Sequence, residues 1–192
     1  MFKIMREQLL RLRRQRWNSE YQKGKWDFLQ HLEELGHNSI LAGYARYLGA
    51  GSVLDVGCGT GHLLQLLDNV ESYVGLDISQ AALERCQVLA DARPNCFFIE
   101  ADFDTFVPSN CYDLVVFNES LYYSRHPYET LKAYRCSLVS GGGHMAVSMY
   151  DNSRAPVIWA AVDALFESLD ETKVQLQDKT WTCRLLRARQ NA

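Results

Sequence analysis

Residues 53–64 read VLDVGCGTGHLL, an apolar run that breaks into three closely spaced glycines and then resumes with leucines at helical spacing. The apolar and β-branched residues around Asp55 predict a buried strand, and the leucines predict the inner face of a helix. Gly57, Gly59 and Gly61 therefore lie in a strand-to-helix turn, where a ligand can approach the main chain beside the helix N-terminus. The alternative is a tight turn that binds nothing, because short glycine patterns also match by chance.

The length and composition limit the class of protein. A chain of 192 residues with 47% hydrophobic and 22% charged residues predicts one soluble globular domain without a membrane span. Its six cysteines show neither a C-x-x-C pair nor a zinc-like Cys/His spacing, so we expect reduced thiols and no metal site. With no secretory apolar segment in the sequence, these features favour a cytoplasmic protein.

The N-terminal segment differs in charge from the rest of the chain. Residues 1–16 hold six basic residues and one acidic residue, a formal charge of +5 within a net charge of −3. Phe2, Met5, Leu9 and Leu12 recur at helical spacing, which predicts an amphipathic helix with a basic outer face. A helix packed on the domain is favoured, with an anion or nucleic-acid contact and an organelle-targeting peptide as alternatives.

Strand-like and helix-like segments alternate along most of the chain. The predicted strands are 52–56, 72–77, 96–101, 112–117 and 143–150, followed by a strand pair at 168–177 and 180–187. The predicted helices are 1–16, 27–48, 61–68, 80–90, 127–139 and 156–166. This alternation predicts an α/β fold with a doubly wound, mainly parallel sheet that ends in an antiparallel strand pair.

Open parallel sheets bind ligands at the carboxyl ends of their strands, so the residues there are candidate site residues. Asp55 and the glycines follow the first strand, and Asp77 ends the second, at the position that suits a carboxylate on both ribose hydroxyls. Asp102 and Phe103 follow the third strand and suit an adenine ring. Asn118 and Glu119 follow the fourth strand.

The glycine spacing distinguishes between cofactors. A dinucleotide fingerprint needs G-x-G-x-x-G, but this run is GCGTGH with His62 in the last position. A P-loop would need Lys after the last glycine. The remaining candidate is a cofactor with adenosine at one end and a charged, phosphate-free group at the other.

The run DVGCGTG at 55–61 resembles motif I of the class I S-adenosylmethionine (SAM)-dependent methyltransferases, and the chain is similar to their small, single-domain type 11/12-like members. GLDIS, EADF, YDLVVFNESLYY and LVSGGGHMAV resemble the later motifs in the family's order. The resemblance runs from about residue 40 to the C-terminus. It implies a Rossmann-like, seven-stranded doubly wound sheet, with N-terminal helices, that binds SAM and releases S-adenosylhomocysteine (SAH).

Carried over residue by residue, the resemblance implies Asp77 on the ribose, Asp102, Phe103 and Ile78 at the adenine, and the Gly57 and Asn118 region at the methionine part. The full set of expected cofactor-binding residues is Tyr21, Trp26, Asp55, Gly57, Cys58, Gly59, Gly61, Asp77, Ile78, Asp102, Phe103 and Asn118.

Methyl transfer needs a general base only when the nucleophile arrives protonated. Glu119 is the first candidate because it directly follows Asn118, with Tyr123 and His126 next. Tyr122 and His144 are weaker candidates. Packing is the simpler role for His144 and for both tyrosines, and a position at the start of a helix is the simpler role for His126. His62 is expected to be solvated, although it opens a helix beside the glycine turn.

The segment before the sheet is rich in aromatic residues. WNSEYQKGKWDF at 17–28 carries more aromatic surface than a linker needs, which favours a lid or substrate wall with Tyr21 or Trp26 at the cofactor. Simple helix packing is the alternative. We therefore expect residues 1–50 to form a helical segment of the same domain and residues 51–192 to form the SAM-binding core.

The fourth-strand motif bears on the acceptor. Asn118-Glu119-Ser120-Leu121 differs from the N-P-P-Y of enzymes that methylate planar nitrogens, so we expect an oxygen or amine nitrogen of a small molecule, or an exposed glycan or peptide group. An RNA-modifying enzyme that uses the basic helix and a non-catalytic methyltransferase-like partner subunit stay open as alternatives. Nucleic acid is the less favoured partner because the rest of the chain is acidic. An NAD-linked oxidoreductase is disfavoured by His62. The sequence leaves the oligomeric state undetermined.

Overall fold

The computed structural model describes residues 2–138 and 142–190. Its helices are α1 (Phe2–Gln22), α2 (Leu32–Leu48), α3 (His62–Leu66), α4 (Gln80–Ala92), α5 (Pro127–Arg135) and α6 (Ala155–Leu165), with 3₁₀ turns η1 (Asp27–Gln30) and η2 (Leu121–Tyr123). Its strands are β1 (Ser52–Val56), β2 (Ser72–Asp77), β3 (Cys96–Glu100), β4 (Leu114–Asn118), β5 (His144–Tyr150), β6 (Phe166–Leu176) and β7 (Lys179–Ala188).

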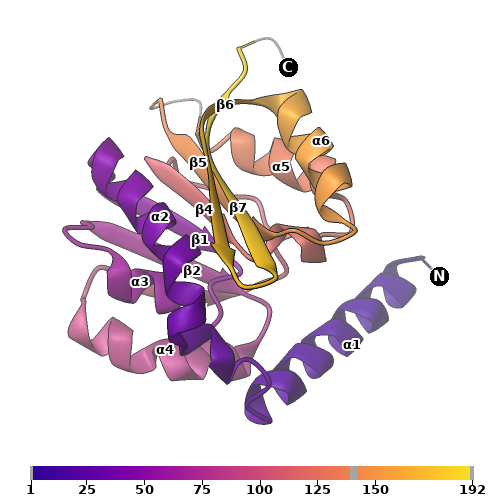
Figure 1. Cartoon of the computed structure of the whole chain (residues 1–192). Helices are drawn as coiled ribbons and strands as arrows, with labels where there is room; N and C mark the ends of the chain where they lie inside the picture. Colours follow the sequence, from indigo (N-terminus) through magenta and orange to yellow (C-terminus); the bar gives the residue numbers. More distant parts are fainter. Residues whose placement is uncertain (1, 139–141, 191–192) are drawn as a thin grey trace.

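The strands form one seven-stranded sheet in the order β3-β2-β1-β4-β5-β7-β6. Strands β1 to β5 pair in parallel, whereas β7 runs antiparallel to both β5 and β6. Figure 1 shows α2, α3 and α4 on one face of the sheet and α5 and α6 on the other. The predicted doubly wound sheet with a terminal antiparallel pair is confirmed. The strand order reverses between β1 and β4, which is where such a sheet opens a binding crevice.

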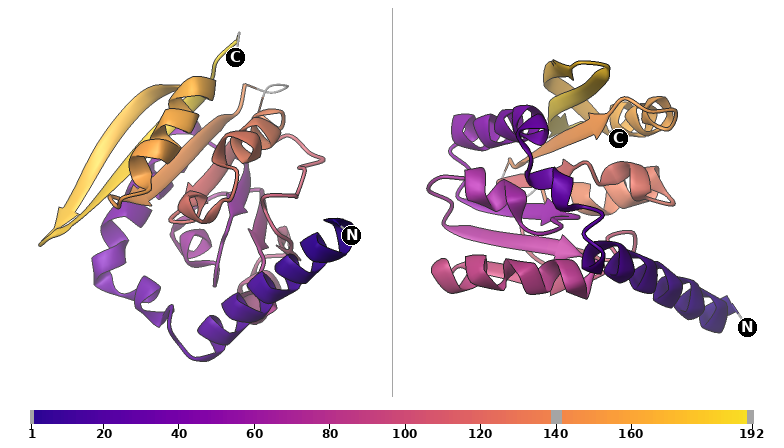
Figure 2. Two further views of the ribbon diagram at one scale, coloured as in Figure 1. Left: turned by 90° about the vertical axis from the view of Figure 1, so that its right-hand side faces the viewer. Right: turned by 60° about the horizontal axis from the view of Figure 1, so that its bottom comes forward.

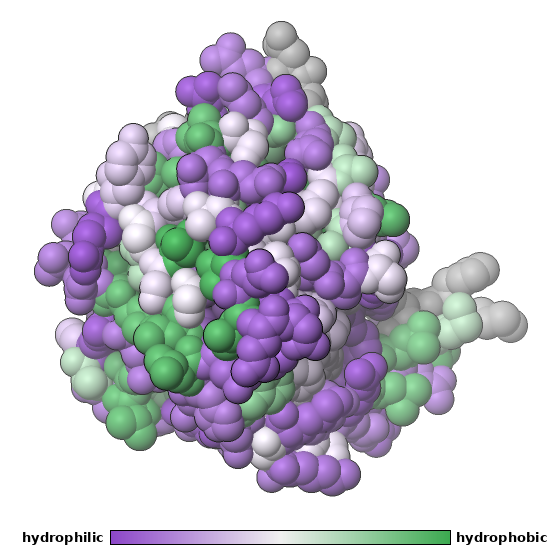
Figure 3. All heavy atoms as spheres, viewed as in Figure 1, coloured by the Kyte–Doolittle hydropathy of each residue, from purple (hydrophilic) through white to green (hydrophobic). Residues whose placement is uncertain are grey.

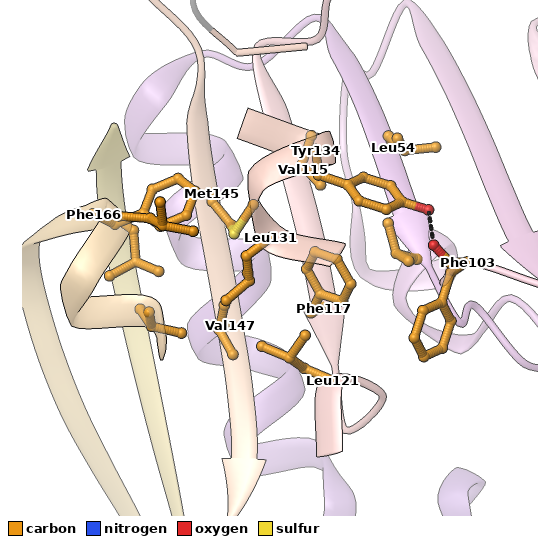
Figure 4. Close-up of a cluster of buried hydrophobic side chains, with 14 of the residues drawn as sticks. Leu54, Phe103, Val115, Phe117, Leu121, Leu131, Tyr134, Met145, Val147 and Phe166 are labelled. Carbon is orange, nitrogen blue, oxygen red and sulfur yellow. Dashed lines mark hydrogen bonds between the residues drawn. The ribbon is translucent and has the colours of Figure 1, made fainter. Parts of the chain in front are cut away.

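Alternate residues of the central strands fill two hydrophobic cores. Leu54, Val115 and Phe117 pack toward α5 and α6, together with Tyr134 and other side chains shown in Figure 4. Their neighbours in the chain, such as Val53 and Leu114, pack on the opposite face against α2 and α3. Each fully buried side chain of this size stabilises the fold by about 1.5–3 kcal/mol. The two cores hold the carboxyl ends of the strands in place.

Several predicted boundaries differ from those in the structure. The fourth strand begins two residues later than predicted, at Leu114, and the helix predicted from residue 27 is a 3₁₀ turn followed by α2. Helix α5 ends at Arg135, and the residues described after it, up to 138, form turns. The predicted helix end at residue 139, Gly141 and residue 1 lie outside the described residues.

Helix α1 departs most from the prediction. It continues to Gln22 instead of ending near residue 16, and its N-terminal part projects from the body of the domain (Figure 2). Met5, Leu9 and Leu12 of the predicted inner stripe are 53%, 52% and 56% exposed, and Figure 3 shows hydrophobic residues on this projecting part. The expectation that this stripe packs on the domain is wrong for the first three turns of α1, where these three side chains stay more than half exposed in the described part of the chain. Within the described residues, no helix has both the length and the apolarity needed to cross a membrane.

Candidate active site

The carboxyl ends of β1 to β5 open into a cavity of about 450 Å³. Helix α1, the segment after it, helix α2 and the start of β7 complete its walls. Its lining includes most of the predicted site residues, namely Tyr21, Trp26, Asp55, Gly57, Cys58, Gly59, Asp77, Ile78, Asp102, Phe103, Asn118, Glu119 and Tyr123. The sheet topology therefore gathers residues that are up to about one hundred positions apart in the chain.

The glycine turn brings bare backbone to the cavity wall. The N–H groups of Gly57 and Cys58 donate to the carbonyl of Leu76, at 2.7 and 3.0 Å, and so tie the turn to β2. Gly57 has φ +78°, and a Cβ added there would lie 2.5 Å from Ser120 Cβ. A Cβ at Gly59 would lie 2.8 Å from the hydroxyl oxygen of Tyr21. Both positions require glycine, and the turn leaves room for a ligand against the main chain.

Two buried carboxyl groups flank this turn. Asp77 accepts hydrogen bonds from the N–H groups of Ser79 (2.8 Å) and Gly59 (3.0 Å), and burial raises its pKa to about 6 despite these bonds. Asp55 accepts from the Tyr73 hydroxyl at 2.6 Å through Oδ2, while Oδ1 has no hydrogen-bond partner among the described residues. Burial raises the pKa of Asp55 to about 7. A ligand that donates hydrogen bonds would use the remaining acceptor capacity of both carboxyl groups.

Asp102 is tied to two arginines at the end of β3. Arg13 of α1 donates to both of its oxygens, at 3.2 and 3.3 Å, and Arg125 donates to Oδ2 at 2.8 Å. The same arginines contact Asp104, whose pKa falls to about 2 because hydrogen bonds from Ser124 and Arg125 outweigh the effect of burial. This cluster fastens α1 across the end of the sheet. Phe103 lies beside it, edge-on to the ring of Phe117.

Aromatic side chains of the N-terminal segment close the same side of the cavity. The ring of Trp17 lies 5.3 Å from that of Trp26 and edge-on to that of Tyr123 at 4.9 Å. The indole N–H of Trp26 donates to Glu20 at 3.2 Å. Tyr21 and Trp26 therefore lie at the cavity, where a lid or substrate wall requires them.

Glu119 lies on the opposite side of the cavity from the Asp102 cluster. It adopts φ +53°, and its carboxylate accepts from Ser148 Oγ (3.2 Å), the Tyr122 hydroxyl (3.1 Å) and the Tyr150 N–H (3.1 Å). Burial raises its pKa to about 7, although His37 and these hydrogen bonds act in the opposite direction. Such a group can accept and release a proton near neutral pH.

Three candidates lie outside the cavity lining. His126 is exposed at the start of α5, so the structure does not support its candidacy as a base. A Cβ at Gly61 would meet Leu89, so this glycine serves close packing of α4 rather than a ligand. His144 begins β5, at the end of the strand opposite to the cavity. His62 does line the cavity and is only partly exposed, contrary to the expectation of a solvated position.

Several cavity residues were not predicted from the sequence, namely Arg13, Glu34, His37, Asn38, Lys179 and Trp181. Three of them share one signal. Glu34, His37 and Asn38 have the spacing of one helix face, and that face continues with the buried Leu41 and Tyr44. Polar residues at the N-terminal end of a buried apolar stripe indicate that a helix points into a polar site. Arg13, Lys179 and Trp181 reach the cavity through tertiary contacts that no local sequence pattern predicts.

This topology, with a glycine turn after β1 and an acid ending β2, defines the class that the sequence motifs predicted, a class I methyltransferase domain. The chain belongs to the family described as "Methyltransferase domain", whose model matches residues 49–187. The predicted family is thus confirmed.

Two kinds of relatives support this assignment. Trans-aconitate 2-methyltransferase of Enterobacter sp. (strain 638) is 38% identical over 107 residues, which are 54% of this chain and 41% of that protein. The chain thus matches less than half the length of this curated relative. The N-methyltransferase NodS from Bradyrhizobium japonicum WM9, solved with SAH, is 15% identical with a TM-score of 0.78, covering 92% of this chain and 98% of that one.

The 1,6-didemethyltoxoflavin-N1-methyltransferase of Burkholderia thailandensis, solved with bound 1,6-didemethyltoxoflavin and SAH, also has a TM-score of 0.78 at 14% identity, covering 95% of this chain and 89% of that one. At these identities the likeness to both solved structures concerns the fold alone.

Proposed function

We propose that this chain transfers the methyl group of SAM to an oxygen or amine nitrogen of a small molecule. The observation that carries the proposal is the pair of buried acids beside the glycine turn. Asp55 is 1% exposed and retains one oxygen without a hydrogen-bond partner in the described residues, and it lines the cavity. A buried carboxylate oxygen of this kind fits a cationic donor such as the ammonium group of the cofactor's methionine part.

The remaining cofactor contacts follow from the same wall. Asp77 lies beside Gly59 and can accept hydrogen bonds from both ribose hydroxyls, since each carboxylate oxygen has a second lone pair. Ile78 and Phe103 offer apolar surface for the adenine ring. Both oxygens of Asp102 already accept hydrogen bonds, from Arg13, Arg125 and the Asp104 N–H, so the adenine amino group would bind Asp102 by replacing one of these donors. Gly57, Cys58 and Asn118 surround the methionine part.

Bound SAM supplies a methyl group on a sulfonium that is already a good leaving group. The chain's residues therefore need to position the acceptor and exclude water. Trp17, Tyr21 and Trp26 shield the cavity from the side of α1. Glu119 accepts the proton of the acceptor where the acceptor arrives protonated. Tyr122 and Tyr123 line the same region and can orient the acceptor through their hydroxyl groups.

The cavity favours a small acceptor. A volume of about 450 Å³ lies within the range of small-molecule sites. Aromatic rings and two carboxyl groups, those of Glu34 and Glu119, surround the end that lies away from Asp102.

Calorimetric titration with SAM and SAH tests the proposal before any acceptor is known. NAD serves as the ligand control and Asp77→Ala as the protein control. Saturable binding of SAM and SAH, absent with NAD and lost in the variant, is the expected result. Binding of NAD in preference to SAM, or no binding of SAM at millimolar concentration, would contradict it.

A further inference from the structure

Helix α2 and strands β4 and β5 align four polar side chains in one hydrogen-bonded row. Glu34 Oε2 lies 2.9 Å from His37 Nε2, His37 Nδ1 lies 3.2 Å from Ser148 Oγ, and Ser148 Oγ lies 3.2 Å from Glu119 Oε1. Glu34, His37 and Ser148 are 4%, 1% and 0% exposed. The row thus runs from the cavity wall at Glu119, through a serine inside the wall, to the pair on α2.

The row contains three hydrogen bonds, and each needs one proton. When Glu119 is ionised, the Ser148 hydroxyl donates to it, and Nδ1–H of His37 then donates to Ser148. The proton between His37 and Glu34 belongs either to an imidazolium or to a protonated carboxyl. The Glu34–His37 pair is therefore net neutral in this arrangement.

The same row also accommodates the opposite direction of donation. When Glu119 is protonated, its O–H donates to Ser148, Ser148 donates to Nδ1 of His37, and Nε2–H of His37 donates to an ionised Glu34. Both arrangements hold the same number of protons and the same total charge. They differ by the movement of one proton from Glu119 to the Glu34–His37 pair across the Ser148 hydroxyl.

The surroundings hold the row without competing for its protons. The Tyr122 hydroxyl and the Tyr150 N–H donate to Glu119 Oε2 and leave Oε1 to Ser148. Among the described residues, Tyr123 faces Glu119 and the charged Lys179 faces Glu34, and the Cys183 thiol and His62 also lie near Glu119 and His37. Burial raises the pKa of the Cys183 thiol and lowers that of His62. Both are therefore neutral near pH 7.

The imidazole of His37 is also held mechanically. Its ring stacks on the indole of Trp181 at 5.2 Å with an interplanar angle of 15°. The ring therefore keeps Nδ1 toward Ser148 and Nε2 toward Glu34.

We propose that Glu34, His37 and Ser148 form a proton relay that takes the resting proton of Glu119 onto the Glu34–His37 pair, so that Glu119 is ionised when it receives the proton of the acceptor. The identity of the proton donor rests on the proposed function, and the acceptor class is a nucleophile that arrives with an N–H or O–H bond at the reacting atom. A carboxylate acceptor carries no such proton and leaves the relay without a role.

The overall step balances. Before methyl transfer the row passes one proton from Glu119 through Ser148 to the Glu34–His37 pair, and the acceptor's N–H or O–H proton then moves to the ionised Glu119. A bond forms from the acceptor atom to the methyl carbon while the bond from that carbon to sulfur breaks, and its electron pair stays on sulfur. Glu119 is then protonated while the pair still holds the first proton, and the row returns one proton to solvent after product release. His37 and Ser148 act through Glu119 and are positioning residues.

The ¹⁵N signals of His37 test the relay without an acceptor. They distinguish protonated from unprotonated Nδ1 and are assigned by their loss in His37→Asn. Slightly above pH 7, where Glu119 is ionised, wild-type Nδ1 should be protonated. In Glu119→Gln the amide oxygen must accept from the Tyr150 N–H, so its NH₂ faces Ser148 and reverses the row. Nδ1 should then be unprotonated, with the proton on Nε2.

Ser148→Ala serves as the matched control, because it removes the connecting hydroxyl and keeps both ends. The double variant Ser148→Ala with Glu119→Gln should give the same His37 signals as Ser148→Ala alone. The proposed relay is wrong if Glu119→Gln leaves the ¹⁵N signals of His37 unchanged. It is also wrong if Glu119→Gln still changes these signals in the Ser148→Ala background. If Ser148→Ala does not fold, the difference in Nδ1 protonation of His37 between the wild type and Glu119→Gln still tests the relay. SAH titration of the same samples tests the proposed function separately.

Discussion

Replacing Asp77 with Asn tests the cofactor site in detail. The two oxygens of Asp77 each accept one backbone N–H, from Ser79 and from Gly59. Asn has one oxygen, so its NH₂ must face one of these donors. The lost bond at a buried donor should lower the free energy of unfolding by about 1–3 kcal/mol.

The same change removes one charge-assisted hydrogen bond to a ribose hydroxyl. Such a bond is worth about 1.5–3 kcal/mol, so the affinity for SAH should fall between about tenfold and a hundredfold. The wild-type affinity should also weaken as the pH falls through about 6, where Asp77 becomes protonated, and Asp77→Asn should show no such weakening. Calorimetry with SAH between pH 5 and pH 8 measures both effects, and urea unfolding measures the stability.

Asp113→Asn is the matched control at the opposite end of the sheet. Asp113 accepts the N–H groups of Gly51 and Ser52 through the same oxygen, at 3.1 and 2.8 Å, so an amide oxygen preserves both bonds. Neither stability nor SAH affinity should change in this variant. Full SAH affinity in Asp77→Asn, or an equal loss in Asp113→Asn, would refute the assignment of Asp77 to the cofactor.

Three further predictions concern the buried acid, helix α1 and the glycine turn. Burial raises the pKa of Asp55 to about 7, so the folded state binds this proton more tightly than the unfolded chain, and the group's contribution to stability is lost as the pH rises from about 4 to about 7. Urea unfolding between pH 4 and pH 7 should show a smaller decrease in the free energy of unfolding for Asp55→Asn than for the wild type. An equal pH dependence of the two proteins would contradict this prediction. Arg13→Ala should speed the release of SAH, because Arg13 ties α1 to the end of the sheet. Replacing the exposed Arg11 with Ala should leave the release rate unchanged. Stopped-flow tryptophan fluorescence measures both rates, and equal rates in the two variants would argue against a lid. Gly57→Ala should destabilise the fold by about 1–3 kcal/mol because of its positive φ and the close approach of a neighbouring side chain, whereas the exposed helical Gly43→Ala should stabilise it by up to about 1 kcal/mol. Unfolding midpoints of these two variants that move in the same direction would contradict that reasoning.

The fold was largely predictable because its signals are local. Apolar runs of strand length alternate with helical patterns, and a Gly-rich turn links the first strand to its helix. Parallel strands joined by helices have few possible arrangements, so a doubly wound sheet with a terminal antiparallel pair followed from the order of the elements, whereas the strand order came from the structure. The errors lie at element ends, as at Leu114, and in α1, where an amphipathic pattern exists without a surface to cover it.

The candidate site was predictable at the strand ends and, through the aromatic excess of residues 17–28, at Tyr21 and Trp26. Asp55, Asp77 and Asp102 could be named because the carboxyl end of a parallel strand lies at the binding edge. His126 was misplaced because the sequence does not specify in which direction the loop after β4 turns. Glu34 and His37 were missed, although their spacing on the buried face of α2 carried a signal.

The sequence by itself determined the order of strands and helices, the glycine turn and the acids at the strand ends, because periodicity and parallel connectivity act over short distances. Only the tertiary structure decided that Arg13 meets Asp102 and that His37 meets Ser148, across 89 and 111 residues of chain. These contacts depend on the angles at which α1 and α2 cross the ends of the sheet. Those angles are set by the packing of many side chains at once, which no local pattern specifies.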